Sequence, residues 1–135
     1  MMRGSCCCGA VAFEIQAQPK DIYCCHCSIC RRSTGVQGVA VLVVPNTSFS
    51  WTQGQQELRH WAKPDADWEK NFCALCGSPL PGPNDPEHTY VPAGLITQGG
   101  EGLRVAAHIF TDDKASWFEP GDGAPRHGQH FQRKG

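Results

Sequence analysis

Cysteines are the residues of this sequence with the greatest capacity for chemistry. There are nine, and seven of them fall into three closely spaced groups: Cys6-x-Cys8, Cys25-x-Cys27-x-x-Cys30 and Cys73-x-x-Cys76. A turn over Cys-x-x-Cys lets two thiolates reach one ion, and residues i and i+2 of an extended segment face the same side. In a reducing compartment such groups are typical of metal sites rather than disulfides.

The three groups together predict two zinc sites of different kinds. Structural zinc takes four ligands in a closed tetrahedron, and one Cys-x-Cys with one Cys-x-x-Cys supplies that set. We therefore expect a structural zinc held by Cys6, Cys8, Cys73 and Cys76. The middle group then holds a second zinc through three thiolates, Cys25, Cys27 and Cys30. Three protein ligands and an open position are the pattern of catalytic zinc.

Other assignments remain open at this point. The third cysteine group could join the middle one, which would leave the first pair without a role. The middle site could be purely structural, closed by Cys24, His26 or a distant histidine. Cys7 and Cys24 neighbour predicted ligands but point to the opposite side of an extended segment, so we expect neither to bind metal.

Length and composition limit the class of protein. The 135 residues fit a single domain, 1–135, and 40% of them are hydrophobic. No apolar run is long enough to span a membrane, and the start of the chain lacks the apolar core of a secretory signal, so we expect a cytoplasmic protein. A net charge of −1 argues against binding nucleic acid through a basic surface. The oligomeric state cannot be inferred.

The elements that position the cysteines are predicted to be short strands. Alternating apolar residues at Val11, Phe13 and Ile15 predict a half-buried strand. The β-branched run over residues 35–45 predicts a buried strand that follows a cysteine-rich loop. Residues 49–61 predict a hairpin with its turn at 53–55.

The second half of the chain is predicted to be more irregular. We expect strands over residues 90–96 and 103–110 and a short helical turn over 112–118. Residues 79–86 hold four prolines, which predicts no regular structure there. The polar chain after Gly121 is expected to be loose. The predicted fold is therefore all-β, or β-rich, with short antiparallel strands and metal knuckles.

Four segments, in order, resemble the signatures of the glutathione-dependent formaldehyde-activating (GFA) family, which includes the centromere protein V relatives. The first is Gly4-Ser5-Cys6-Cys7-Cys8-Gly9-Ala10-Val11, and the second runs from Cys25-His26-Cys27 through Cys30-Arg31-Arg32 to Gly35. The third is Phe72-Cys73-Ala74-Leu75-Cys76-Gly77-Ser78-Pro79. The last comprises His108-Ile109-Phe110, Ser116-Trp117 and Asp122-Gly123-x-Pro125. These motifs span residues 4–126, and residues 127–135 are expected to form a loose tail.

The resemblance implies a β-tent type of fold and the same two zinc sites. We expect the second site to be partly occupied, because three protein ligands leave the ion exposed and more weakly held. The resemblance also implies a carbon–sulfur lyase reaction, in which glutathione and formaldehyde form S-hydroxymethylglutathione, or the same chemistry on another small aldehyde. The alternative is a non-catalytic, zinc-stapled interaction module. Additional thiols at Cys7 and Cys24 and the proline-rich segment 80–83 depart from the family pattern.

Four polar residues are candidates for work beside the second zinc. A coordinating thiol loses its proton, so a bound glutathione sulfur could be held there as the thiolate. Arg31 and Arg32 follow the ligand Cys30 and could bind the carboxylates of the peptide. His26 is a candidate proton shuttle or a packed knuckle residue, and His108 a candidate base or a satisfied strand histidine.

Overall fold

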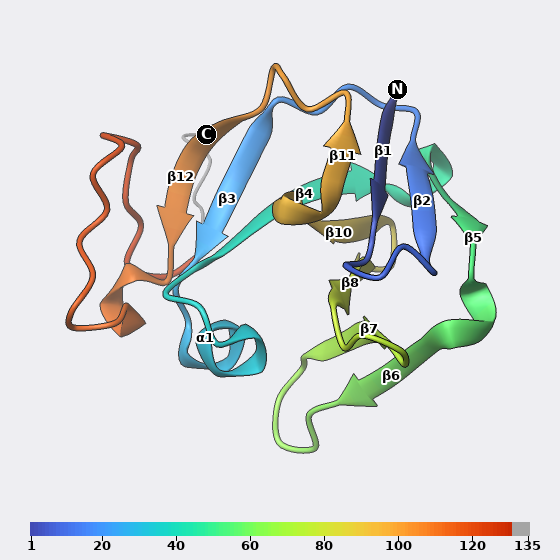
Figure 1. The fold of residues 1–135 in the computed structure, drawn as a ribbon. Helices are drawn as coiled ribbons and strands as arrows, with labels where there is room; N and C mark the ends of the chain where they lie inside the picture. Colours follow the sequence, from blue (N-terminus) through green and yellow to red (C-terminus); the bar gives the residue numbers. More distant parts are fainter. Residues whose placement is uncertain (131–135) are drawn as a thin grey trace. The chain divides into compact units, whose positions relative to one another are not determined.

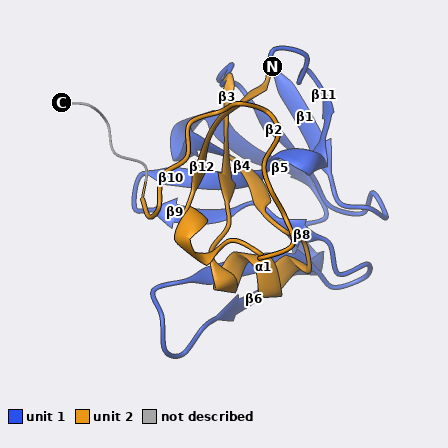
Figure 2. Cartoon of the chain, turned by 90° about the vertical axis from the view of Figure 1, so that its left-hand side faces the viewer, with its two compact units in different colours: residues 1–19, 42–102 blue, residues 20–41, 103–135 orange. Residues whose placement is uncertain are grey.

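The structure is a computed structural model that describes residues 1–130. Figure 1 shows their short strands and connecting turns. The chain forms two compact units, each built from two separate segments (Figure 2). Unit 1 contains residues 1–19 and 42–102, and unit 2 contains residues 20–41 and the chain from Leu103 onward. Short strands dominate both units, which confirms the predicted β-rich fold class. Division into one domain over 1–135 stays a prediction.

The first sheet of unit 1 has four antiparallel strands in the order β11-β1-β2-β5. They are β1 (Met2–Ser5), β2 (Ala12–Ile15), β5 (Phe49–Gln53) and β11 (Ile96–Gln98). The predicted alternation is confirmed, because Val11, Phe13 and Ile15 are all buried. The ring of Phe13 lies 5.5 Å from that of Phe49 and 6.3 Å from that of Trp51, centroid to centroid. This apolar face holds β1, and hence the first cysteine pair, in place.

The second sheet of unit 1 corrects the predicted hairpin over residues 49–61. Its order is β6-β7-β8, with β6 (Leu58–Ala62), β7 (Glu69–Cys73) and β8 (Pro79–Leu80). The strands predicted for residues 49–61 exist as β5 and β6, but β5 pairs with β2 and β6 pairs with β7. The predicted turn runs on into a 3-10 turn, η2 (Gln55–Glu57), which redirects the chain.

The proline-rich segment 79–86 is more regular than its composition predicts. It contains β8 and a further strand, β9 (Gly82–Asp85), which pairs with β10 (His88–Pro92). Among the described strands, β8 pairs with β7 alone and β9 with β10 alone, so both are edge strands, where a residue without an N–H is tolerated. The strand predicted over 90–96 is interrupted by a 3-10 turn, η3 (Ala93–Leu95). A similar turn, η1 (Asn46–Ser48), directly precedes β5.

Unit 2 is built on β3 (Asp21–Cys25) and β12 (Arg104–Ile109). These two strands run parallel, whereas antiparallel strands were predicted. On its other side β3 pairs with the first residues of β4 (Val39–Pro45), which continues into unit 1. The strand predicted over residues 35–45 therefore begins only at Val39. Between β3 and β4 lies a seven-residue helix, α1 (Ser28–Thr34), where a cysteine-rich loop was expected.

The described residues include no helix long and apolar enough to cross a membrane.

The C-terminal segment is attached to β12 instead of loose. The N–H of His108 donates to the carbonyl of Pro125 at 2.8 Å, and the N–H of His127 donates to the carbonyl of His108 at 2.8 Å. The N–H of Phe110 likewise donates to the carbonyl of Gln129. Residues 125–129 thus extend unit 2, whereas residues 131–135 of the predicted tail lie outside the described residues. The helical turn predicted over 112–118 is a shorter 3-10 turn, η4 (Thr111–Asp113).

Candidate metal centres

The first cysteine cluster lies within unit 1. The ligand atoms of all four members, Cys6, Cys8, Cys73 and Cys76, lie within 4.8 Å of one another. The sulfurs of Cys6 and Cys8 are 3.6 Å apart, and those of Cys8 and Cys73 are 3.9 Å apart. A tetrahedron with metal–sulfur bonds of about 2.3 Å has edges of about 3.8 Å. The donor set therefore fits a tetrahedral thiolate site.

Two tight turns shape this first cluster. After β1, the N–H of Gly9 donates to the carbonyl of Cys6 at 3.0 Å, and the N–H of Val11 donates to the Cys6 sulfur at 3.3 Å. After β7, the N–H of Gly77 donates to the carbonyl of Cys73 at 2.8 Å. Gly77 has a φ of 77°, a conformation that side-chain-bearing residues rarely adopt.

The hydroxyl of Ser78 links the two turns. The N–H of Cys7 donates to Ser78 Oγ at 2.9 Å, and Ser78 Oγ lies 3.2 Å from the sulfur of Cys76. With its oxygen accepting from Cys7, the hydroxyl proton can be donated to that sulfur. Hydrogen bonds from the hydroxyl and N–H of Ser78, and from the N–H of Cys8, lower the pKa of the Cys76 thiol to about 5. Cys76 thus favours the thiolate form that a metal requires.

The second cluster lies within unit 2 and contains three thiols, those of Cys25, Cys27 and Cys30. Cys25 ends β3, and Cys27 caps α1, its sulfur accepting a hydrogen bond from the N–H of Cys30 at 3.2 Å. Hydrogen bonds from the thiols of Cys25 and Cys30 and from backbone N–H groups hold the pKa of Cys27 far below its usual range. The same sharing raises the pKa of Cys25 and Cys30, because a thiol that donates a hydrogen bond to its neighbour is held in its protonated form.

A cation fits this second donor set. Three thiols that favour only one thiolate among them need a positive ion before all three can ionise. Among the described residues, this metal-competent group has three members and the first has four. The sulfurs of Cys7 and Cys24 belong to neither cluster. Cys24 is half-buried on β3, where burial and the charge of Asp122 raise the pKa of its thiol.

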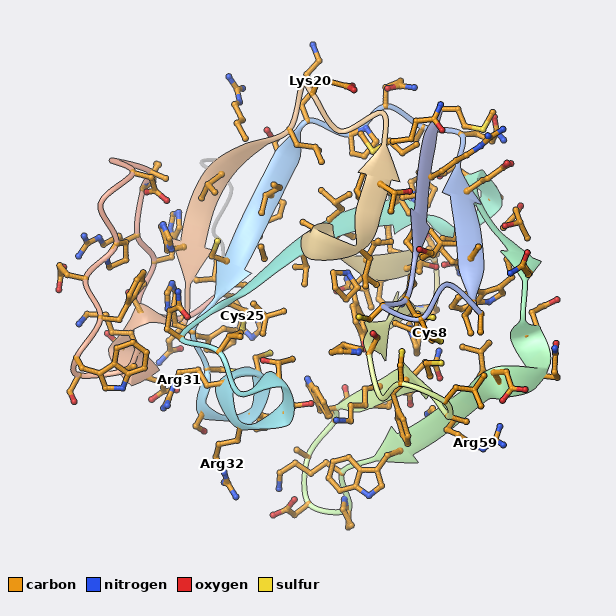
Figure 3. The ribbon with its side chains drawn as sticks, viewed as in Figure 1. Cys8, Lys20, Cys25, Arg31, Arg32 and Arg59 are labelled. Atoms are coloured by element: carbon orange, nitrogen blue, oxygen red, sulfur yellow. The ribbon has the colours of Figure 1, made fainter. Side chains whose placement is uncertain are left out.

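The two arginines after the second cluster are placed differently. Nε of Arg31 donates to the carbonyl of His26 at 3.3 Å, so this side chain is tied to the cysteine turn. Arg32 extends away from Cys25, on the outer side of α1 (Figure 3). Of the two predicted substrate-binding residues, the structure holds Arg31 beside the cluster.

Both candidate histidines are buried and belong to one hydrogen-bonded chain in unit 2. Nε2 of His26 lies 2.8 Å from Nδ1 of His108, and Nε2 of His108 lies 2.9 Å from the carboxylate of Asp122. The carboxylate accepts from Nε2–H of His108, which leaves Nδ1 of His108 to accept from Nε2–H of His26. Burial, the largest effect, lowers the pKa of His26, which favours its neutral form. The remaining contact, from His26 Nδ1 to the Gln37 carbonyl, is the longest at 3.2 Å.

Sequence reasoning did not connect the members of this chain. His26 was weighed as a shuttle and His108 as a base, but their contact joins residues 82 positions apart. Asp122 and Gln37 were not candidates at all. Asp122 stood only in a motif of the supposed loose tail, and the Gln37 contact is made by its backbone carbonyl, which no side-chain pattern reveals.

Comparison with known proteins agrees with this picture. The fold and the cysteine groups define a class of β-rich proteins that could hold metal ions. A family profile described as glutathione-dependent formaldehyde-activating enzyme, GFA, matches residues 1–113, and the chain belongs to this family.

Two relatives bear on the comparison. A Halomonas elongata protein named "Putative glutathione-dependent formaldehyde-activating enzyme" is 29% identical over 129 residues, covering 88% of this chain and 80% of its own. A crystal structure of a Rhodobacter sphaeroides protein is similar with a TM-score of 0.60 and 25% identity. That match covers 72% of this chain and 89% of the other.

Proposed function

We propose that this chain binds zinc at both cysteine clusters and uses the second to hold the thiol of glutathione, or a similar small thiol, against an aldehyde. The observation that carries the proposal is the difference in donor number, since a zinc ion that prefers four ligands finds only three sulfurs in the second cluster. Membership of the GFA family supports glutathione and formaldehyde as the reactants.

The first zinc is proposed to be structural and the second functional. The structural ion is assigned to Cys6, Cys8, Cys73 and Cys76. The functional ion is assigned to Cys25, Cys27 and Cys30. When bound at the second cluster, zinc would keep an incoming thiol deprotonated. A centre of three thiolates and one cation carries a net charge near −1, which makes direct polarisation of a carbonyl the weaker alternative.

The reaction we propose is a reversible carbon–sulfur bond formation. The glutathione sulfur attacks the carbonyl carbon of formaldehyde, the C–S bond forms, and the electron pair of the C=O double bond moves to oxygen. The thiol proton ends on that oxygen, giving S-hydroxymethylglutathione. The lyase direction breaks the same C–S bond and releases the same two molecules.

Arg31 is the residue proposed to orient the peptide. Its Nε is occupied by the His26 carbonyl, which fixes the guanidinium next to the cysteine turn. The remaining N–H groups are suited to a carboxylate of glutathione. Arg32 on the outer side of α1 is its matched control (Figure 3). We expect Arg31→Ala to weaken glutathione binding several-fold and Arg32→Ala to leave it close to wild type.

The decisive test is zinc stoichiometry with and without glutathione. We expect two zinc ions per chain, one in Cys30→Ser, and two in the control Cys24→Ala. Glutathione should change the coordination or content of the second zinc only, and exchange NMR should show faster interconversion of free and glutathione-bound formaldehyde. If glutathione affects neither zinc, the thiol-binding proposal is wrong and the chain is a zinc-stapled interaction module.

A further inference from the structure

The side chain of His26 is enclosed on every side that the structure describes. It is 1% exposed, and its ring lies 6.0 Å from that of Phe118, nearly parallel at 24°. A Cβ added at Gly38 would stand 2.8 Å from its Cε1, so only glycine leaves room for the ring there. Since Nε2–H of the neutral ring donates to His108, Nδ1 carries no proton and its 3.2 Å approach to the Gln37 carbonyl is a packing contact.

In the sequence, His26 lies between two members of the second cluster, Cys25 and Cys27. The N–H of His26 donates to the carbonyl of Ile109 at 3.0 Å, where the parallel pairing of β3 with β12 ends. The carbonyl of His26 accepts from Nε of Arg31. Backbone and ring of this one residue therefore fix the turn from Cys25 to Cys27 against β12.

Asp122, at the end of the hydrogen-bonded chain that starts at His26, is itself held firmly. Asp122 accepts from the N–H of Ala124 at 3.0 Å as well as from His108. The guanidinium of Arg126 contacts the carboxylate of Glu119 and donates to the carbonyl of Pro120 at 2.7 Å. The segment that carries Asp122 is thus closed on itself and joined to β12 through the His108–Arg126 bridge.

We propose that His108 and Asp122 are positioning residues for the second cluster, acting through His26, which rests on the proposed function of that cluster as a metal site. Asp122 fixes the ring of His108, and Nδ1 of His108 fixes the ring of His26. A fixed His26 holds the thiols of Cys25 and Cys27 in converging directions before any ion arrives. Neither residue touches the sulfurs or a substrate in this scheme.

The test exploits the fact that asparagine can replace one ring nitrogen of histidine. The amide oxygen of His108→Asn can take the place of Nδ1 and accept from His26, whereas His108→Phe keeps the ring shape and loses the acceptor. A positioning role predicts that Phe weakens metal binding at the second cluster about ten-fold and that Asn restores most of it. A packing role predicts the reverse order, because Asn leaves a void that Phe fills.

Cobalt(II) is the probe, added after one equivalent of zinc, with its visible thiolate bands giving affinity and geometry. Asp122→Asn should weaken cobalt binding and shift the bands. Asp113→Asn removes a carboxylate of unit 2 that lies outside the hydrogen-bonded chain, and it should do neither. Amide exchange of residues 26–30, measured at one zinc equivalent, should be faster in His108→Phe than in wild type and slowed again in His108→Asn.

The outcomes separate the two proposals. Wild-type cobalt affinity, bands and exchange in His108→Phe overturn the positioning role, as does weaker binding by Asn than by Phe. If Cys30→Ser still binds cobalt as wild type does, the proposed metal site itself fails. Amide exchange then decides the positioning role alone, and equal exchange in wild type, His108→Phe and His108→Asn overturns it.

Discussion

The two cysteine clusters are built by opposite strategies. The first draws four thiols from two segments distant in sequence, and it is backed by groups that touch those segments directly: backbone N–H groups, the hydroxyl of Ser78 and an apolar core. The second draws three thiols from six consecutive residues, and its backing is long-range, a buried chain from His26 through His108 to Asp122. A donor set complete in itself needs little else, whereas an incomplete one depends on residues that are not ligands.

The two Asp–His pairs show the same contrast. In unit 1, Asp85 and His88 form an exposed pair 2.8 Å apart in the β9–β10 hairpin. In unit 2, the ring of His108 is buried, and its pair with Asp122 is continued by a second imidazole. An exposed pair contributes little to stability because water competes for it, whereas a buried one constrains its neighbours.

The largest effect is expected from removing one ligand of the first cluster. Cys76→Ser should lose one zinc and lower the melting temperature by about 10 °C or more, because zinc binding at a closed thiolate site contributes directly to folding. Cys7 is also an exposed cysteine but lies outside the cluster, so Cys7→Ser should keep the wild-type zinc content and melting temperature. Zinc analysis with thermal unfolding measures this, and a Cys76→Ser chain with normal zinc and melting would break the comparison.

Filling the space beside His26 tests the long-range backing of the second cluster. In Gly38→Ala the new methyl overlaps the imidazole, which should destabilise the fold by about 1–3 kcal/mol. Gly121→Ala is the control, since a Cβ there meets nothing within 4 Å. Denaturant unfolding reports the stability, and second-site metal affinity should fall in parallel. Equal stability of the two variants would show that the ring is not held where the structure places it.

Removing the hydroxyl that joins the two turns sharpens the account of the first cluster. Ser78→Ala should weaken zinc binding there by roughly ten-fold, and Ser78→Thr should restore it. Ser48→Ala removes a hydroxyl of the same unit that bonds only to the carbonyl of Pro45, and it should have no effect on zinc. Competition with a chromophoric chelator measures the affinity. An unchanged affinity in Ser78→Ala would leave the first cluster with the support of backbone N–H groups and the apolar core.

The smallest effect concerns pH and the exposed pair. His88, the largest contributor, together with the N–H of Glu87 lowers the pKa of Asp85 to about 2. A carboxyl with a depressed folded-state pKa stabilises the fold above its unfolded pKa near 4, and this contribution disappears as the pH falls toward 2. Wild type should therefore be slightly more stable than Asp85→Asn at pH 6, and the gap in melting temperature should narrow on acidification. A gap that widened would contradict the sign.

Local patterns in the sequence predict the cysteine groups and several strands. Spacing identifies which thiols can converge, since turn and strand geometry act over two or three residues, and alternation identifies the strand ending at Ile15. These local patterns do not predict which strands pair. The hairpin over 49–61 was wrong because strand partners are chosen by sheet packing, and a seven-residue helix such as α1 is too short to show a helical period.

The long-range support of the second cluster lies beyond such patterns. His26 and His108 meet only because β3 and β12 pair in parallel, a pairing that no local feature announces. Asp122 lies in a polar stretch that composition alone marks as loose. That stretch is nevertheless held by Arg126, which donates to the carbonyl of Pro120, and by backbone bonds to β12. The prolines of residues 79–86 led to a wrong prediction for a related reason. A proline, which has no N–H, disrupts a strand that is paired on both sides, but it is tolerated in an edge strand.

The position of Asp122 far downstream of the three cysteines sets an order of events during synthesis. Cys25, Cys27 and Cys30 leave the ribosome together, and closing so short a loop costs little entropy. His108 and Asp122 emerge some eighty or more residues later, when most of unit 1 is already available to fold. The nascent chain can thus gather three thiols early but can lock them only after residue 122 has been made. A product that stopped before Asp122 would carry the three thiols without the support of His108 and Asp122.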